Sequence, residues 1–219
     1  MDKPGIAVPY SVEEMRYLVR EVRAKGVYAA AVLLPIALEK ISYQYDRFID
    51  DPKCSHDVNL RSNAYGLPTH TLTVNYARRL DEKDTPPFSD PDEQQWWRDA
   101  HDPAQQSFYV SENRARLIDL NEDPQHWRLG LPYQQRGNAL VLPKGTLPGG
   151  LKPDQVSLEA LTRHQDSDHW NSERVLTTQS LQRYLKADGS PLADGHAEFE
   201  ALAGPLEIAQ LDKTALAAY

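Results

Sequence analysis

The sequence predicts an α+β fold dominated by helices, with an N-terminal helical hairpin, a small antiparallel sheet and C-terminal helices. Two patterns and a recurring residue pair support this prediction. Apolar residues between positions 27 and 48 recur at alternating steps of four and three, the spacing of one helix face. Leu72, Val74 and Tyr76 alternate with polar residues, as in a half-buried strand. Asp-Pro pairs, which favour helix starts, recur along the chain.

The N-terminal hairpin is expected to form the centre of the core. Ser11 and Glu14 have the spacing of a capping box ahead of an apolar stripe, and Gly26 is expected to end that helix. The helix over residues 27–48 follows at once and is apolar nearly all round in its first half, so it is predicted to be buried. A third helix is predicted to start at Asp51-Pro52 and to end near Tyr65.

The rest of the chain is predicted to alternate short strands with helices. A surface loop covers residues 78–92, and Asp90-Pro91 starts a short helix. Short strands at 108–110, 116–120 and 139–142 are expected to join the strand at Leu72, and helices are expected around 158–163, 176–185 and 192–202. We predict one domain, 1–219, with two lobes divided near 147–153 at a turn rich in Pro and Gly.

Composition excludes several classes of function. The 219 residues carry a formal net charge of −8, which disfavours a nucleic-acid binder because phosphate contacts need clustered Lys and Arg. No apolar run is long enough for membrane insertion, and no nucleotide-binding glycine motif is present, so we expect no cofactor. A single cysteine and the lack of a visible signal peptide predict a cytoplasmic protein, or one exported without a cleaved signal.

Cys54 is the candidate nucleophile of an alternative, enzymatic interpretation. In the first turn of the predicted third helix, its thiolate would be stabilised by the helix dipole. The segment Cys54-Ser55-His56-Asp57-Val58, with Gly66-Leu67-Pro68 beyond it, resembles papain-like amidases of the bacterial cell wall. That resemblance covers about fifteen residues and implies a cysteine-dependent hydrolase with a histidine on a later strand. His164 and His196 are both candidates for this histidine, and a small, semi-buried structural cysteine is the simpler alternative.

A second group could serve a metal-dependent hydrolase. His164, Asp166, Asp168 and His169 lie within six positions, and imidazole with carboxylate suits Zn, Mn or Fe. No zinc-protease or paired-cysteine motif accompanies them, and polar loops of this kind usually cap the next helix. No metal site is therefore favoured.

Aromatic residues support a protein-interaction module. Tyr and Trp are enriched at contact surfaces, and the candidate binding residues are Trp96, Trp97, Tyr109 and Trp127. Consecutive residues on a helix point about 100° apart, so Trp96 and Trp97 are hard to bury together. We expect an acidic surface bearing aromatic residues to bind a protein partner of basic character.

Overall fold

The described residues form one antiparallel sheet in which strand order follows sequence order. The computed structural model describes residues 9–26, 29–45, 49–146, 156 and 158–209. The eight strands of this part of the chain pair in the order β1-β2-β3-β4-β5-β6-β7-β8. They are β1 (Ser11–Arg23), β2 (Val32–Gln44), β3 (Lys53–Ser62), β4 (Pro68–Asn75), β5 (Ser107–Asp123), β6 (His126–Pro143), β7 (Val175–Leu185) and β8 (Leu202–Ala209).

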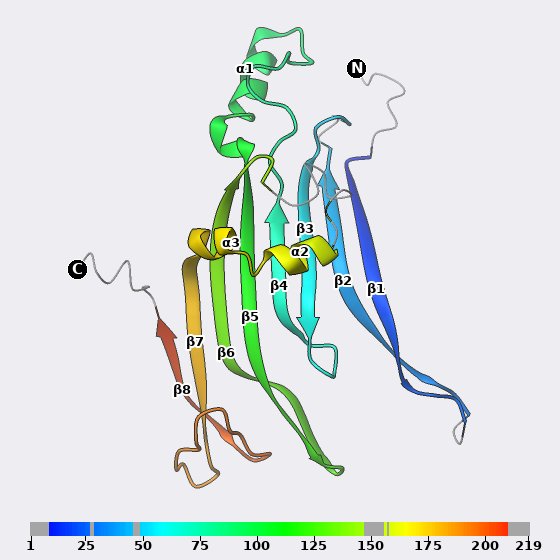
Figure 1. Cartoon of the computed structure of the whole chain (residues 1–219), viewed down its shortest axis with the longest axis vertical. Helices are drawn as coiled ribbons and strands as arrows, with labels where there is room; N and C mark the ends of the chain where they lie inside the picture. Colours follow the sequence, from blue (N-terminus) through cyan, green and yellow to red (C-terminus); the bar gives the residue numbers. More distant parts are fainter. Residues whose placement is uncertain (1–8, 27–28, 46–48, 147–155, 157, 210–219) are drawn as a thin grey trace, which may run out of the picture.

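Helices occupy two places on this sheet. α2 (Leu158–His164) and α3 (Asp168–Glu173) lie across one face near the middle of the strands (Figure 1). α1 (Pro91–Asp99) and a 3-10 turn, η1 (Pro103–Gln106), lie at one end of the sheet, in the connection between β4 and β5. The Asp90 side chain accepts from the backbone N–H groups of Asp92 and Glu93, which caps α1 as the Asp-Pro pair predicts.

The core lies between α2, α3 and the central strands. Along β5, Phe108 and Val110 face the core and are buried, whereas Tyr109 and Ser111 point to the other face. The same alternation runs through β4 and β6, and Leu161 and Trp170 cover these side chains from α2 and α3. One face of the central sheet is therefore a core and the other is polar, as in many antiparallel sheets.

The far half of the β1–β2 hairpin extends beyond the other strands as a two-stranded ribbon. β2 pairs with β3 only from Glu39 to Gln44, so the part of β2 from Val32 to Leu38 pairs with β1 alone. We call β1 from Tyr17 to Arg23, together with Val32–Leu38, the ribbon. It projects from one side of the sheet (Figure 1).

The helix-dominated α+β prediction is wrong, because the predicted N-terminal helices are strands β1 and β2. The misleading period has a physical cause. Arg16 pairs with Glu39 and Tyr17 pairs with Ala37, so Leu38 is an extra residue in a β-bulge. The bulge shifts the alternation of sides by one residue, so the buried residues Ile36 and Ile41 are an odd number of positions apart and the simple period of two that identifies a strand is lost along β2.

Other expectations are met or corrected element by element. The predicted helix at 51–65 is β3, whose buried residues Cys54, His56 and Val58 alternate with more exposed neighbours. The predicted helix at 176–185 is β7, and residues 192–202 are mostly irregular, with two short turns before β8. The strand at Leu72, the short helix after Asp90 and the helix at 158–163 are confirmed. The division between lobes near 147–153 falls outside the described residues.

Candidate functional site

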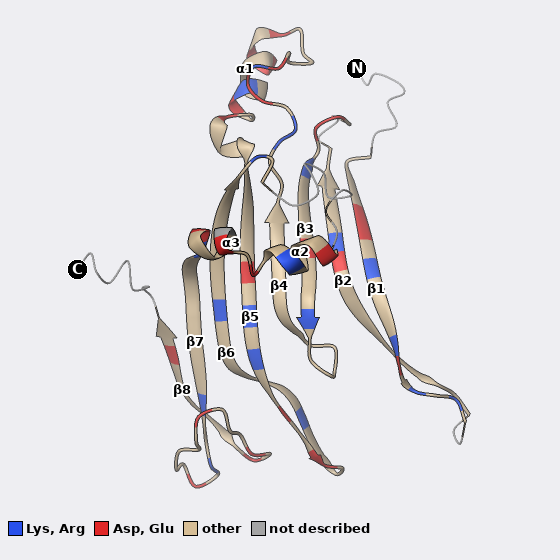
Figure 2. Cartoon of the chain, viewed as in Figure 1, with Lys and Arg blue, Asp and Glu red and all other residues tan. Residues whose placement is uncertain are grey.

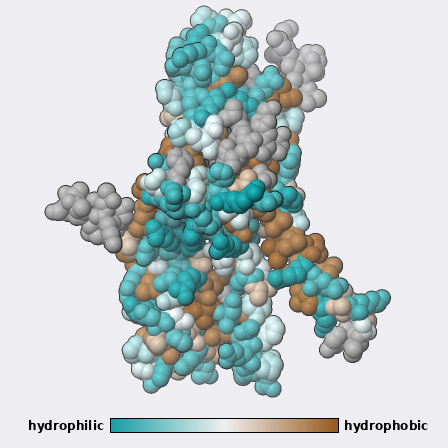
Figure 3. All heavy atoms as spheres, viewed as in Figure 1, coloured by the Kyte–Doolittle hydropathy of each residue, from teal (hydrophilic) through white to brown (hydrophobic). Residues whose placement is uncertain are grey.

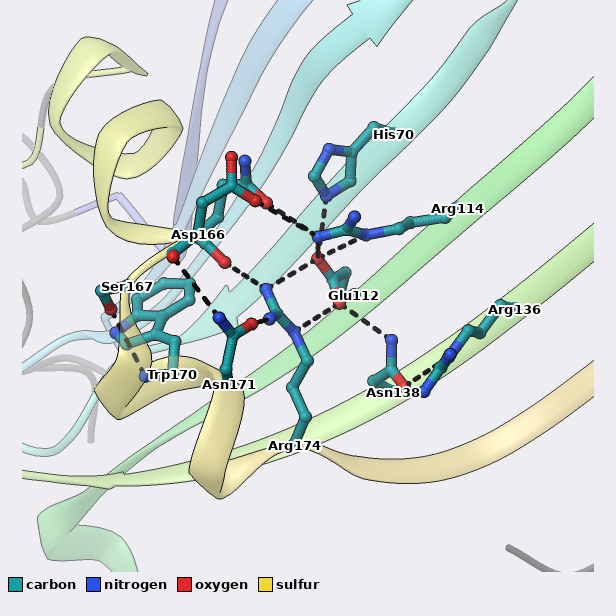
Figure 4. A network of polar contacts seen from close by, with 11 residues as sticks. His70, Glu112, Arg114, Arg136, Asn138, Asp166, Ser167, Trp170, Asn171 and Arg174 are labelled. Atoms are coloured by element: carbon teal, nitrogen blue, oxygen red, sulfur yellow. Dashed lines mark hydrogen bonds and ion pairs between the residues drawn. The ribbon is translucent and has the colours of Figure 1, made fainter.

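Hydrogen bonds to one buried carboxylate link the sheet to the segment of α2 and α3 that covers it. Glu112 on β5 is 1% exposed, and its Oε1 accepts hydrogen bonds from His70 Nε2 at 2.9 Å and Arg114 Nη2 at 2.8 Å. Its Oε2 accepts from Asn138 Nδ2 and from Arg174 Nε, each at 2.8 Å (Figure 4). Arg174 follows α3 directly, so this one carboxylate connects three strands to the end of the cover.

The network keeps Glu112 ionised. Burial alone would raise its pKa, but the hydrogen bonds from His70 and Arg114, with the charges of Arg114 and Arg174, lower the pKa to about 2. Sequence reasoning missed Glu112. The alternation of sides along β5 could have identified it, because Glu112 is two positions beyond the buried residues Phe108 and Val110 in the same series. Arg114 is the next residue in that series. A carboxylate on the buried side of a strand needs cationic partners.

A second buried contact fixes α1 against the sheet. The two ring nitrogens of His101 face acceptors: the Trp97 carbonyl is 2.7 Å from Nδ1, and the Asp51 carboxylate is 2.6 Å from Nε2. The Trp97 ring stacks on the His101 ring at 4.0 Å between centroids. Asp51 also accepts from the backbone N–H of Arg79 at 2.8 Å. The position of α1 is therefore set by the connection between β2 and β3.

The two adjacent tryptophans have different environments. Trp97 is 6% exposed, whereas Trp96 is 69% exposed on the outer side of α1. Carboxylates surround α1, as the acidic positions near this end of the sheet show (Figure 2), and they come from Asp90, Asp92, Glu93 and Asp99. α1 thus presents one exposed indole within an acidic surface.

The other candidate aromatic residues do not join this surface. Trp127 is 60% exposed beside the tip of the β5–β6 hairpin, at the end of the sheet opposite α1 (Figure 1). Tyr109 is 41% exposed on the face away from the core, and its hydroxyl donates to the Ala104 carbonyl at 2.8 Å. The structure therefore separates Trp96 from Trp127 by the length of the sheet.

The ribbon carries apolar side chains on a face that lacks a cover in the described structure. Cross-strand pairing puts Tyr17 beside Ala37, Val19 beside Pro35, and Leu33 beside the charged Glu21. Tyr17, Val19 and Leu33 are 54%, 58% and 57% exposed. We call the five residues Tyr17, Val19, Leu33, Pro35 and Ala37 the ribbon stripe. Figure 3 shows hydrophobic residues gathered along the ribbon.

Comparison with known proteins identifies the family. The family described as "Insecticide toxin TcdB middle/C-terminal region" matches residues 2–131, more than half of the chain. The chain belongs to this family.

Solved structures of TcdB-type toxins share the fold along the whole of this chain. The crystal structure of TcdB2-TccC3 matches with a TM-score of 0.81 and 24% identity, and that of TcdB2-TccC3 without the hypervariable C-terminal region matches with 0.79 and 25%. The structure of TcdB2-TccC3-Cdc42 also matches, with 0.79 and 24%. Each match covers 100% of this chain but 10% of the solved chain, so this chain spans about a tenth of their length. No curated protein matches the sequence.

The surroundings of Cys54 differ from those that the hydrolase interpretation requires. The helix start required by a Cys54 nucleophile does not exist, because Cys54 lies within β3 and is 5% exposed. Burial raises the pKa of its thiol, although Arg79 acts in the opposite direction. In the described part of the chain, Cys54 makes no hydrogen bond to a histidine; its Sγ lies 3.4 Å from the Pro52 carbonyl. His164 ends α2, and His196 lies between β7 and β8.

The described side chains of the histidine and aspartate group do not come together around one point. Asp166 lies 3.9 Å from Arg114, and Ser167 caps α3 in front of Asp168. The side chain of His169 lies outside the described residues. Among the side chains that are described, no group of three or more His, Cys, Asp or Glu is arranged to hold a metal ion. Within the same part of the chain, no helix is long and apolar enough to cross a membrane.

Proposed function

We propose that this chain is a protein-interaction module of a TcdB-type insecticidal toxin, and that the ribbon stripe is buried against another polypeptide of the toxin assembly. The observation that carries the proposal is the ribbon, which exposes Tyr17, Val19 and Leu33 on one side. The matched crystal structures are those of TcdB2-TccC3. This supports a second toxin polypeptide as the partner.

The energetics of the ribbon support a missing partner. A two-stranded hairpin is only marginally stable in water, because it lacks neighbouring strands and a covered face. The ribbon pairs with no third strand in the described structure, and contiguous apolar surface of this kind marks interaction sites. Burying three large side chains would supply roughly 25 cal/mol for each Å² of apolar area removed from water.

The sheet edges supply a second means of contact. β1 and β8 are the outermost strands of the described sheet, so the outer side of each has backbone groups that another strand can pair with. β1 is 13 residues long, and its side chains include Met15 and Val22, which are 53% and 60% exposed. Addition of a strand at β1 would extend the sheet and shield the ribbon together.

The acidic surface around α1 favours a partner of basic character. Trp96 is held outward by a helix whose other indole, Trp97, is anchored on His101. An exposed Trp among carboxylates is suited to a partner that offers an apolar pocket with a basic rim. Folding in the cytoplasm, with export by a route without a cleaved signal as the alternative, remains a prediction.

A charge placed in the ribbon stripe tests this function. The variant Val19→Asp/Leu33→Asp should leave the fold intact, because both side chains are already exposed, but it should prevent assembly with the cognate toxin polypeptides. Complex formation is measured by size-exclusion chromatography with light scattering after co-expression. Glu14→Gln, at an exposed position of the same strand outside the ribbon stripe, is the control that should assemble normally. Normal assembly of the Asp variant would contradict the proposal.

A further inference from the structure

Three arginines lie close together on the face of the sheet that α2 and α3 cover only in part. Arg114 and Arg116 belong to β5, and Arg136 on β6 is directly opposite Arg114 in the register. Bands of Lys and Arg appear on β5 and β6 beyond the cover (Figure 2). Like charges directly opposite each other on adjacent strands destabilise a sheet, so their repulsion needs to be balanced.

Among the described residues, only one of the three arginines lies at ion-pair distance from carboxylates. Arg114 Nη2 lies 2.8 Å from Glu112 and 3.9 Å from Asp166. Arg136 Nε instead donates to the amide oxygen of Asn138 at 3.2 Å. Arg116 Nη1 donates to the amide oxygen of Gln134, also at 3.2 Å. Neither Arg116 nor Arg136 has a carboxylate at ion-pair distance among the residues that the structure describes.

These guanidinium groups border a hollow of the sheet surface. It has a volume of about 640 Å³ and extends from β5 across β6 and β7 to β8, with Leu181 and Ala209 among its apolar lining. Its one carboxylate in the described lining, Glu207, is paired with Arg183 at 2.6 Å. The hollow therefore combines unbalanced positive charge with apolar surface, on a chain whose net charge is −8.

We infer that this hollow binds an acidic polypeptide segment, whose carboxylates pair with Arg116 and Arg136. The volume is that of a site for a ligand of many atoms, and a single inorganic anion would leave most of it empty. Guanidinium groups match carboxylates in bidentate geometry, and Arg116 and Arg136 lie on adjacent strands at the border of the same hollow.

The chain's own cover shows how such a segment would pack. Between α2 and α3, Gln165 accepts from Arg114 Nη2 at 2.8 Å, and Asp166 approaches the same guanidinium. An acidic segment in the hollow would continue this layer along the sheet toward Arg116. The ribbon stripe and Trp96 take no part in it, so this inference stands whether or not the proposed function is correct.

The test uses the whole chain and a fluorescein-labelled peptide of alternating Glu and Ala, with the Gln and Ala peptide as its uncharged match. Fluorescence anisotropy should show binding of the acidic peptide that weakens as salt is raised. Arg116→Gln/Arg136→Gln should weaken it by about tenfold or more, since charge-assisted hydrogen bonds are lost. Arg61→Gln/Arg98→Gln removes the same charge from other exposed positions and should change the affinity less than about twofold.

Each contrary result overturns the inference. Equal affinity of the Arg116→Gln/Arg136→Gln variant and the unmodified chain would place binding elsewhere. Equal affinity of the acidic and Gln peptides, or no binding of either, would show that carboxylates are not the ligand. Inorganic phosphate that displaces the acidic peptide at equal or lower concentration would make the hollow a site for a small anion. Circular dichroism of both double variants checks that the fold is retained.

Discussion

The central strands and the ribbon use the two faces of the same sheet differently. In the central strands the face away from the core carries polar residues such as Asp57, Thr73 and Ser111, and Thr73 donates to Asp57 at 2.6 Å. In the ribbon that face carries Tyr17, Val19 and Leu33. The central strands are thus suited to water on this side, whereas the ribbon is suited to another apolar surface. The residue type along this face therefore changes from polar in the central strands to largely apolar in the ribbon.

Truncation of a core residue should have the largest effect and should separate the two regions clearly. Phe108 is 0% exposed, so Phe108→Ala should destabilise the fold by about 3–5 kcal/mol through lost burial and the cavity left behind. Val19→Ala in the ribbon should change the free energy of unfolding by less than about 0.5 kcal/mol. Denaturant titration of the isolated chain measures both. A large loss for Val19→Ala would show that the ribbon is already packed in the free protein.

Glu112 should be the most sensitive polar position of the central strands. Glu112→Gln removes the charge that pairs with Arg114 and Arg174, and breaking a buried ion pair costs about 3–5 kcal/mol. Glu122→Gln, at an exposed position on the same strand, is the matched control and should have little effect. If both variants lose the same stability, the network contributes nothing beyond surface charge.

The same carboxylate predicts a pH dependence. Its pKa of about 2 in the folded protein lies below the ordinary value of 4.5, so the unfolded chain takes up the proton first as the pH falls. The stabilisation is complete above pH 4.5 and is lost as the pH approaches 2. Unfolding free energies measured across this range should fall less steeply for Glu112→Gln than for the unmodified chain. Parallel pH profiles would contradict this assignment.

Substitution of the two tryptophans of α1 should separate an effect on stability from an effect on binding. Trp97→Ala should destabilise the fold, because its ring packs on His101, whereas Trp96→Ala should leave stability within about 0.5 kcal/mol. In the toxin assembly, Trp96→Ala should instead weaken binding by about 2 kcal/mol. Unfolding and affinity are measured for each variant separately. Equal and purely structural losses would leave no aromatic anchor on this helix.

Local sequence patterns correctly predicted the elements for which the pattern fits only one type of secondary structure. The alternation through Leu72 and Val74 identified β4, and the Asp90-Pro91 pair identified the start of α1. The β1–β2 hairpin was misassigned because the bulge at Leu38 changes the parity of the apolar positions, and because the ribbon is apolar on more than one side. A buried helix and a strand that is apolar on both sides have similar amino-acid composition. The two can be distinguished only by whether the segment pairs with a neighbouring strand.

The candidate sites were harder to predict, because they depend on contacts between distant residues. The prediction of a helix start at Cys54 depends on Asp51-Pro52 as a cap, whereas the Asp51 carboxylate instead contacts the ring of His101, 50 positions away. Arg116 and Arg136 are unremarkable in the sequence, and the register of β5 and β6 makes them neighbours of Arg114. Properties of this kind follow from the pairing of strands and not from local pattern.

The strand order also determines how the sheet can form. Each strand pairs with its neighbour in the sequence, so the sheet can grow one adjacent strand at a time without a distant crossover. In such a linear array, each strand is stabilised chiefly by its immediate neighbours, as in repeat proteins. Opening should therefore begin at β1 or β8 and move inward, and amide hydrogen exchange should be slowest in β4, β5 and β6. The edges that are free to accept a partner are then also the first to come apart without one.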